Sequence, residues 1–148
     1  MLRLFFSLLL LTLLVPESAS AQAAKDSAEF EKCVSDNAYN ARKLESCYMN
    51  EAKRYFGEIE EKYAQLSKLP KIRLIREVSG NPEEYFRKML NAWKAYIKNY
   101  CDIYAVVYNN YSGDGLSYNR ANCLYIMTKE QLNQIGEIQT TYYSNMAN

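Results

Sequence analysis

The sequence predicts an all-α domain of three longer helices plus short ones, held by two disulfide bonds. Three observations support this fold class. Apolar residues recur at helical spacing over three long stretches, one long polar loop interrupts them, and four cysteines follow an N-terminal export signal. A chain of 148 residues has the length of one domain. We therefore expect residues 22–148 to form a single helical domain.

Residues 1–21 have the pattern of a cleavable signal peptide. Arg3 precedes an apolar run from Leu4 to Val15, and Ala19-Ser20-Ala21 supplies the small residues of a cleavage site. We place cleavage after Ala21, with Ala21-Gln22-Ala23 as a second site. The alternative is an uncleaved anchor, but the apolar run is shorter than the roughly 20 residues of a membrane span.

This signal predicts a periplasmic or secreted protein with no transmembrane segment after cleavage. No cysteine precedes Cys33, so we expect no lipid attachment directly behind the signal.

The first part of the domain is expected to contain a short helix and a long one. Residues 27–34 form the short helix, and Asp36-Asn37 supplies a turn. Residues 41–67 carry the clearest helical stripe. Its members are Leu44, Tyr48, Ala52, Tyr55, Ile59, Tyr63 and Leu66.

Residues 68–78 are basic and amphipathic. Lys68, Lys71, Arg73 and Arg76 alternate with apolar side chains, a pattern that suits an anionic membrane or an acidic partner. A solvated helix face is the interpretation we favour, because the run is short and Pro70 interrupts its start.

The next helix has a strong start signal. Asn81 is a good N-cap, Pro82 suits the first helical position, and Glu83 and Glu84 face the positive end of the helix dipole. The helix should extend to about Tyr108. Its expected apolar stripe is Phe86, Leu90, Trp93, Ile97, Tyr100, Tyr104 and Val107.

Residues 109–119, with the sequence NNYSGDGLSYN, predict one long polar loop. The last helix is then expected over about residues 120–142. Its apolar face comprises Leu124, Met127 or Thr128, Leu132, Ile135 and Ile138.

The four cysteines predict two disulfides, because an exported chain enters an oxidising compartment. Three pairings are possible, and proximity in sequence favours Cys33–Cys47 and Cys101–Cys123. A zinc site is the alternative, but the chain has no CxxC pair to supply two ligands from one knuckle. We expect no metal and no cofactor.

The composition argues against an enzyme and against nucleic-acid binding. The chain has no histidine, the commonest general base, and its net charge is only +1. The adjacent carboxylates Glu60-Glu61 and Glu83-Glu84 point in different directions on a helix, so neither pair suits acid–base catalysis. An enzyme is therefore the function class that we expect least.

The order of landmarks resembles that of the LprI-like lysozyme-inhibitor family. These landmarks are Cys33, Cys47, the run Ile59, Tyr63, Leu66, then Trp93-x-x-Tyr96, Cys101, a Gly-containing loop, Cys123 and Thr128. The resemblance spans about residues 30–138. It implies an exported all-helical domain, the two local disulfides named above, and a lysozyme as partner.

The chain differs from the usual family pattern at several polar positions. Asn91 stands where the family has glutamine, Ile97-Lys98 where it has an Arg-Asp pair, and Gln131 where it has arginine. Phe56 and Glu60 replace an aspartate and an asparagine.

Two hypotheses about function follow. In the first, the chain is an inhibitor that covers the sugar-binding cleft and the two catalytic carboxylates of a muramidase. A loop held by the second disulfide would lose little entropy on binding. The predicted contact residues are Tyr108, Tyr111, Asp114, Tyr118 and Arg120.

In the second hypothesis, the chain is a structural or accessory protein of the cell envelope with a Tyr-rich interaction surface. Tyrosines supply 14 of the 20 aromatic residues. Tyr96, Tyr100, Tyr104 and Tyr108 follow one another at four-residue spacing. Exposure of several of these rings would favour an interface over core packing.

Overall fold

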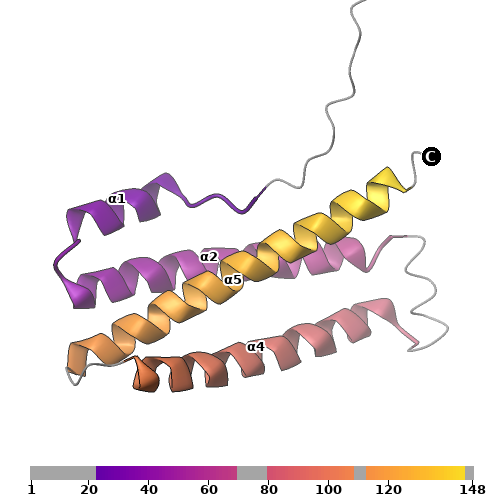
Figure 1. Ribbon diagram of the computed structural model, residues 1–148. Helices are drawn as coiled ribbons and strands as arrows, with labels where there is room; N and C mark the ends of the chain where they lie inside the picture. Colours follow the sequence, from indigo (N-terminus) through magenta and orange to yellow (C-terminus); the bar gives the residue numbers. More distant parts are fainter. Residues whose placement is uncertain (1–22, 70–79, 109–112, 146–148) are drawn as a thin grey trace, which may run out of the picture.

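The computed structural model describes residues 23–69, 80–108 and 113–145. They form four α-helices: α1 (Ala28–Asp36), α2 (Ala41–Leu66), α4 (Pro82–Val107) and α5 (Gly113–Ser144). The predicted all-helical fold with three long helices and one short helix is confirmed (Figure 1). The signal segment, residues 1–21, and all of the basic stretch beyond Leu69 lie outside the described residues.

Side chains cap the starts of three helices. The Ser27 hydroxyl accepts a hydrogen bond from the Phe30 amide at the start of α1, and Asn40 accepts one from Lys43 at the start of α2. Asn81 accepts one from the Glu83 amide, with Pro82 at the first position of α4. The predicted start of α4 is confirmed.

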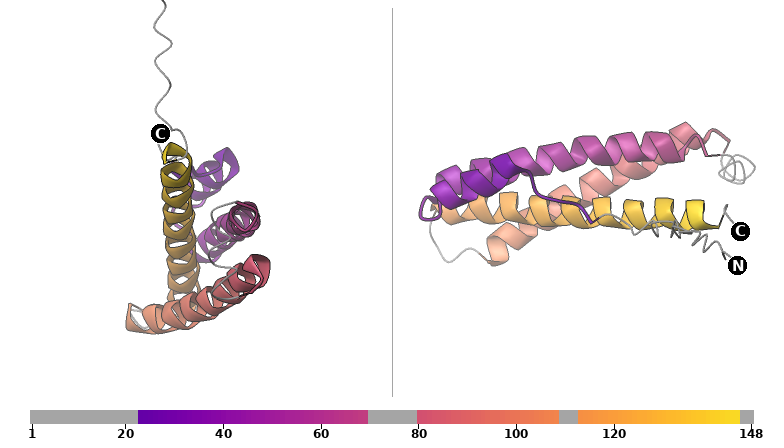
Figure 2. Two further views of the ribbon diagram at one scale, coloured as in Figure 1. Left: turned by 90° about the vertical axis from the view of Figure 1, so that its right-hand side faces the viewer. Right: turned by 90° about the horizontal axis from the view of Figure 1, so that it is seen from above.

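Helices α2 and α5 form the central pair of the bundle and run in the same direction (Figure 1). Helix α4 runs in the opposite direction and packs mainly on α5. Helix α1 packs on α2, so that α1 and α4 lie on opposite sides of the central pair (Figure 2).

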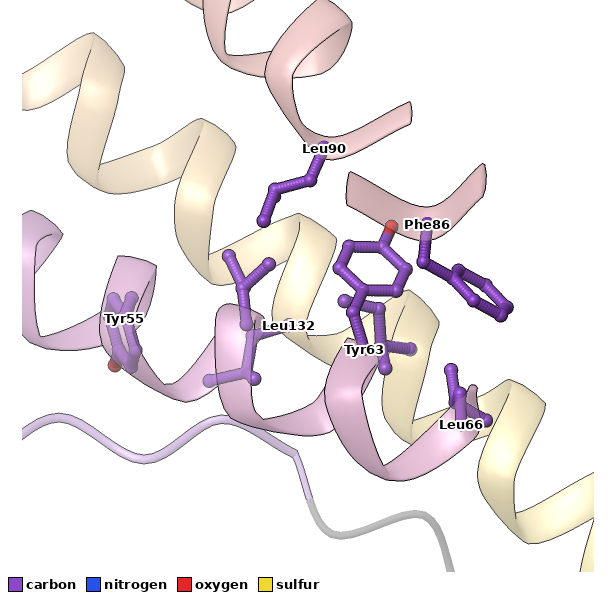
Figure 3. Close-up of a cluster of buried hydrophobic side chains, with 8 residues drawn as sticks. Tyr55, Tyr63, Leu66, Phe86, Leu90 and Leu132 are labelled. Carbon is purple, nitrogen blue, oxygen red and sulfur yellow. The ribbon is translucent and has the colours of Figure 1, made fainter. Parts of the chain in front are cut away.

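The core consists of two apolar clusters. The first joins α2, α4 and α5 and is drawn in Figure 3: Tyr55, Ile59, Tyr63, Leu66, Phe86, Leu90, Leu132 and Ile135. The second surrounds a disulfide: Ala52, Ile97, Cys101, Cys123 and Leu124. The predicted stripe of α2 is buried from Ala52 onward. Of the two alternatives given for α5, Thr128 is buried and Met127 is not.

The predicted apolar stripes of α4 and α5 are wrong toward the C-terminal ends of these helices. Tyr100, Val107 and Ile138 are exposed, and the buried line of α4 continues instead through Cys101 and Ala105. The reason is geometric. Residues at spacing i, i+4 from Ile97 keep facing α5, because the disulfide at Cys101 draws this side of α4 toward it.

The predicted loop over residues 109–119 is also wrong in its second half. Helix α5 begins at Gly113, so residues 113–119 are helical and only residues 109–112 of the predicted loop lie between the two helices. Local preference for a loop at Gly115 and Asn119 is weak in energy compared with tertiary packing. That packing places the Tyr118 ring against Tyr48 of α2.

Both predicted disulfides are present, and no cysteine is left free. Cys33–Cys47 joins α1 to α2, with Cα atoms 5.8 Å apart. Cys101–Cys123 joins α4 to α5 over 5.5 Å and is buried within the second core cluster. The second bridge therefore fixes the end of the bundle at which α4 stops and α5 begins.

Candidate binding surface

The end of the bundle at the α4–α5 connection holds the residues predicted to bind a partner. Tyr108 caps α4 and is 60% exposed, and its carbonyl accepts a hydrogen bond from Asn119 Nδ2 at 3.1 Å. Tyr111 lies outside the described residues. Asp114 lies in the first turn of α5, and the placement of its side chain is not described.

The structure separates the other two predicted residues. Arg120 turns toward α4, where its Nε donates to Asp102 Oδ1, and both side chains are partly exposed. Tyr118 turns toward α2, and its ring meets Tyr48 edge to face at 5.6 Å. Tyr118 therefore supports the bundle, whereas Tyr108 and Arg120 are accessible.

Sequence reasoning missed several exposed apolar side chains near this end. Val107 is 70% exposed, and Ile103, Val106 and Leu116 are also exposed. The sequence pattern places Val107 in the core and Leu116 in a loop, so neither is expected on an exposed apolar surface. The last two turns of α4 contain more apolar residues than one buried face of a helix can hold, and this excess indicates that some of them are exposed.

The four tyrosines of α4 form a continuous row. Ring centroids are 6.0 Å apart between Tyr96 and Tyr100, 6.5 Å between Tyr100 and Tyr104, and 4.4 Å between Tyr104 and Tyr108. Tyr104 is partly buried against the second core cluster, while the other three are exposed. The row thus lies mostly on the surface of the molecule.

Partly buried ionisable groups hold the N-terminal segment in place. Asp26 Oδ1 accepts hydrogen bonds from the Tyr55 hydroxyl at 2.6 Å and the Tyr125 hydroxyl at 2.8 Å, while Oδ2 lies 2.8 Å from Lys129 Nζ. Burial opposes ionisation of Asp26, but the bonds from Lys129 and the two tyrosines outweigh it and lower its pKa.

A second carboxylate, that of the buried Glu51, fixes the start of α1. Glu51 Oε1 accepts the Ser27 amide at 2.8 Å, and Oε2 accepts the Ser27 hydroxyl at 2.8 Å. Arg54 pairs with Glu51 and donates to the Lys25 carbonyl at 2.9 Å. Burial acts against the charged Glu51, yet the bonds from Arg54 and Ser27 lower its pKa overall. These carboxylates are structural ties, since each is occupied by donors of the chain itself.

The described residues contain no group of three or more His, Cys, Asp or Glu placed to hold a metal ion. Among the same residues, no helix is both long enough and apolar enough to cross a membrane. An open hollow of about 380 Å³ lies between the end of α2 and the start of α4. Its charged lining has both signs, Glu60 and Glu83 with Lys68 and Arg87, and so favours neither anions nor cations.

A comparison with protein families matches residues 18–135 to the model described as lysozyme inhibitor LprI. This match covers most of the domain, including all four cysteines and the exposed end of α4. Comparisons with curated proteins and with solved structures gave no match.

Proposed function

This chain belongs to the LprI lysozyme-inhibitor family, and from that premise we propose that it is an exported protein that inhibits a lysozyme by covering its active-site cleft. We further propose that the contact is made by the surface formed by Val107, Tyr108, Leu116, Asn119 and Arg120, here called the α4–α5 tip. The sequence places Tyr111 and Asp114 between these residues, and the proposal includes them.

The observation that carries this proposal is an exposed apolar surface on a fixed scaffold. Val107 and Tyr108 are more than half exposed, at the end of a helix bridged to α5 by Cys101–Cys123. Aromatic anchors held in place before binding contribute most of the energy of protein interfaces, because little entropy is lost when they dock.

The charges at the tip suit a cleft with two carboxylates. Arg120 is partly exposed and can direct its remaining donors outward while Nε stays on Asp102. Asp102 and Asp114 supply local negative charge that favours approach to a basic lysozyme.

Three of the six departures from the family pattern fall on structural positions. Ile97 is fully buried, Gln131 Nε2 donates to the Tyr63 hydroxyl at 2.7 Å, and the Phe56 ring packs on Trp93 at 5.7 Å. None of these three residues belongs to the α4–α5 tip. Their replacement therefore changes how the bundle is held together and leaves the proposed contact surface unchanged.

The proposed compartment follows from the same reasoning. We propose that residues 1–21 direct export and that the mature chain acts in the periplasm or is secreted, where its two disulfides persist. Mass spectrometry of the protein recovered from the periplasm and medium of an expressing cell tests this. A mature chain beginning at Gln22 or Ala24 supports export, and an intact chain in the cytoplasm contradicts it.

The test of inhibition is lysis of cell walls by lysozymes of several types, with and without the oxidised mature protein. We expect dose-dependent inhibition of at least one lysozyme, weakened at least about tenfold by Tyr108→Ala. The matched control is Tyr143→Ala, which removes a similarly exposed ring from the opposite end of the bundle. No inhibition at micromolar concentrations by a protein with an intact helical spectrum would exclude this function.

The exposed tyrosine row favours a second candidate, an accessory protein of the cell envelope with a Tyr-rich interaction surface. Tyr96 and Tyr100 are exposed although they stand at positions that could have faced the core. Recovery of a specific envelope component by the wild type, but not by a Tyr96→Ala, Tyr100→Ala variant, would support this role over inhibition.

A further inference from the structure

Helix α4 carries a second apolar stripe on the side that faces away from α2 and α5. Its seven residues follow one another at alternating spacings of four and three: Tyr85, Met89, Ala92, Tyr96, Asn99, Ile103 and Val106. We call this stripe the α4 seam. Alternating spacings of this kind keep residues on the line along which one helix packs against another.

The seam is exposed along nearly its whole length. Tyr96 is 56% exposed, Ile103 66% and Val106 67%, whereas Ile97, Cys101 and Ala105 on the inner side are buried. Only Met89 of the seam is partly covered, by the first core cluster. The seam therefore has the pattern of a helix-packing face with no helix on it among the described residues.

We propose that the α4 seam binds the α4 seam of a second copy of this chain in antiparallel orientation. The two helices are related by a twofold axis that crosses the seam midway between Ala92 and Tyr96, so that each Tyr96 lies opposite the partner's Ala92. The proposal does not depend on lysozyme inhibition, because it concerns a different face of α4.

Side-chain size selects this orientation. In the antiparallel register, Tyr96 packs opposite the partner's Ala92, and Ile103 packs opposite the partner's Tyr85. Each ring thus meets a smaller side chain. A parallel register would instead place Tyr96 against Tyr96 and Ala92 against Ala92, which crowds one layer and leaves the next one empty.

Charge selects the same orientation. The exposed Lys88 and Asp102 flank the seam on the same side, and the antiparallel register places Lys88 beside the partner's Asp102. Within one chain, Lys88 pairs with Glu84 at 2.8 Å and Asp102 pairs with Arg120. The contact therefore forms a row of four alternating charges on each side of the twofold axis. Each row consists of Glu84 and Lys88 of one chain followed by the partner's Asp102 and the partner's Arg120. A parallel register would bring no opposite charges together.

Asn99 is the one polar residue of the seam. It would lie opposite the partner's Met89. A single polar residue on such a stripe lowers the stability of the pair but restricts its register. From Tyr85 to Val106 the seam is about 32 Å long. This contact belongs to the small class of interfaces, so we expect a dimer with a Kd on the order of micromolar.

Sedimentation equilibrium of the oxidised mature protein, from roughly 1 µM to 1 mM, tests the dimer. We expect a concentration-dependent dimer whose Kd rises at least about tenfold on Tyr96→Glu. The matched control is Tyr143→Glu, because Tyr143 is also 56% exposed but lies on α5. A monomer throughout this range, or a dimer that Tyr96→Glu leaves unchanged, would overturn the proposal.

A charge exchange tests the orientation. Lys88→Asp alone and Asp102→Lys alone each place like charges across the antiparallel contact and should weaken the homodimer. An equimolar mixture of the two variants restores both opposite-charge pairs, so the mixed dimer should approach the wild-type Kd. Since the mixture contains the same two folded variants, local damage cannot explain a recovery. Absence of recovery in the mixture would exclude the antiparallel register.

Discussion

Asp26 and Lys129 are 103 positions apart in the sequence and form an ion pair, with Oδ2 and Nζ separated by 2.8 Å. The same carboxylate also binds hydroxyls of α2 and α5. One side chain of the extended segment before α1 thus joins this segment to both helices of the central pair. These polar contacts hold the N-terminal segment against the bundle.

Removal of the charge at Asp26 should destabilise the domain. Asp26→Asn leaves Lys129 without its counter-charge, and we expect a loss of unfolding free energy of about 1–3 kcal/mol. Urea unfolding followed by circular dichroism measures this loss. Asp36→Asn is the control, because Asp36 pairs with Lys32 in an exposed i, i+4 bridge of little energetic weight. Equal losses of unfolding free energy for the two substitutions would show that the contacts of Asp26 stabilise the domain no more than an exposed ion pair does.

The domain should lose stability in acid. Asp26 and Glu51 both have pKa values lowered by their partners in the folded state. The unfolded chain therefore binds more protons near pH 4, so stability is fully present above this range and falls as the pH drops through the folded pKa values. Unfolding midpoints in urea between pH 7 and pH 3 test this. Their decline should be shallower in a Glu51→Gln variant, which lacks one of the two titrating groups.

Alkaline solution should also destabilise the domain, because the pKa values of two buried tyrosines are raised in the folded state. Burial and the bond to Asp26 raise the pKa of Tyr55 well above its usual range, and burial raises that of Tyr63. The stabilisation is present below about pH 10, where the unfolded chain titrates, and is lost as the pH rises further. Titration by tyrosinate absorbance should show these rings ionising only with unfolding. Ionisation of all tyrosines near pH 10 in the folded protein would contradict this expectation.

The two disulfides should differ in accessibility and in energetic weight. Cys33 is partly exposed, whereas Cys101 and Cys123 are buried in the core. A mild reductant should therefore open Cys33–Cys47 first, as detected by alkylation and mass spectrometry. Each loop closure contributes on the order of 3 kcal/mol. Removal of Cys101–Cys123 should cost more, because Cys101→Ala with Cys123→Ala also leaves space in the core.

The α4–α5 tip and the α4 seam should be separable by mutation. Tyr108→Ala should weaken lysozyme inhibition while the sedimentation behaviour stays that of the wild type. Tyr96→Glu should weaken dimer formation, and a lysis assay at concentrations below the dimer Kd should show unchanged inhibition. Loss of both properties in either variant would indicate that one surface serves both contacts.

Several features of the fold could be predicted because they depend on neighbours in sequence. The cap at Asn81 and Pro82 and the stripe of Ile59, Tyr63 and Leu66 follow from local geometry. The pairings of Cys33 with Cys47 and Cys101 with Cys123 follow from short loops. Of the candidate site, Tyr108 and Arg120 are accessible as expected, while Tyr118 packs toward the interior.

The sequence by itself determined the helical class, the starts of α2 and α4 and the disulfide frame, since each depends on periodicity, capping or loop length over a few turns. Only the tertiary structure decided where α5 begins, which tyrosines of α4 face outward and which carboxylates are buried. Those outcomes depend on packing between segments far apart in sequence. Helical spacing allowed Tyr100 and Val107 to join the core, and the bridge from Cys101 to Cys123 directed another side of α4 inward.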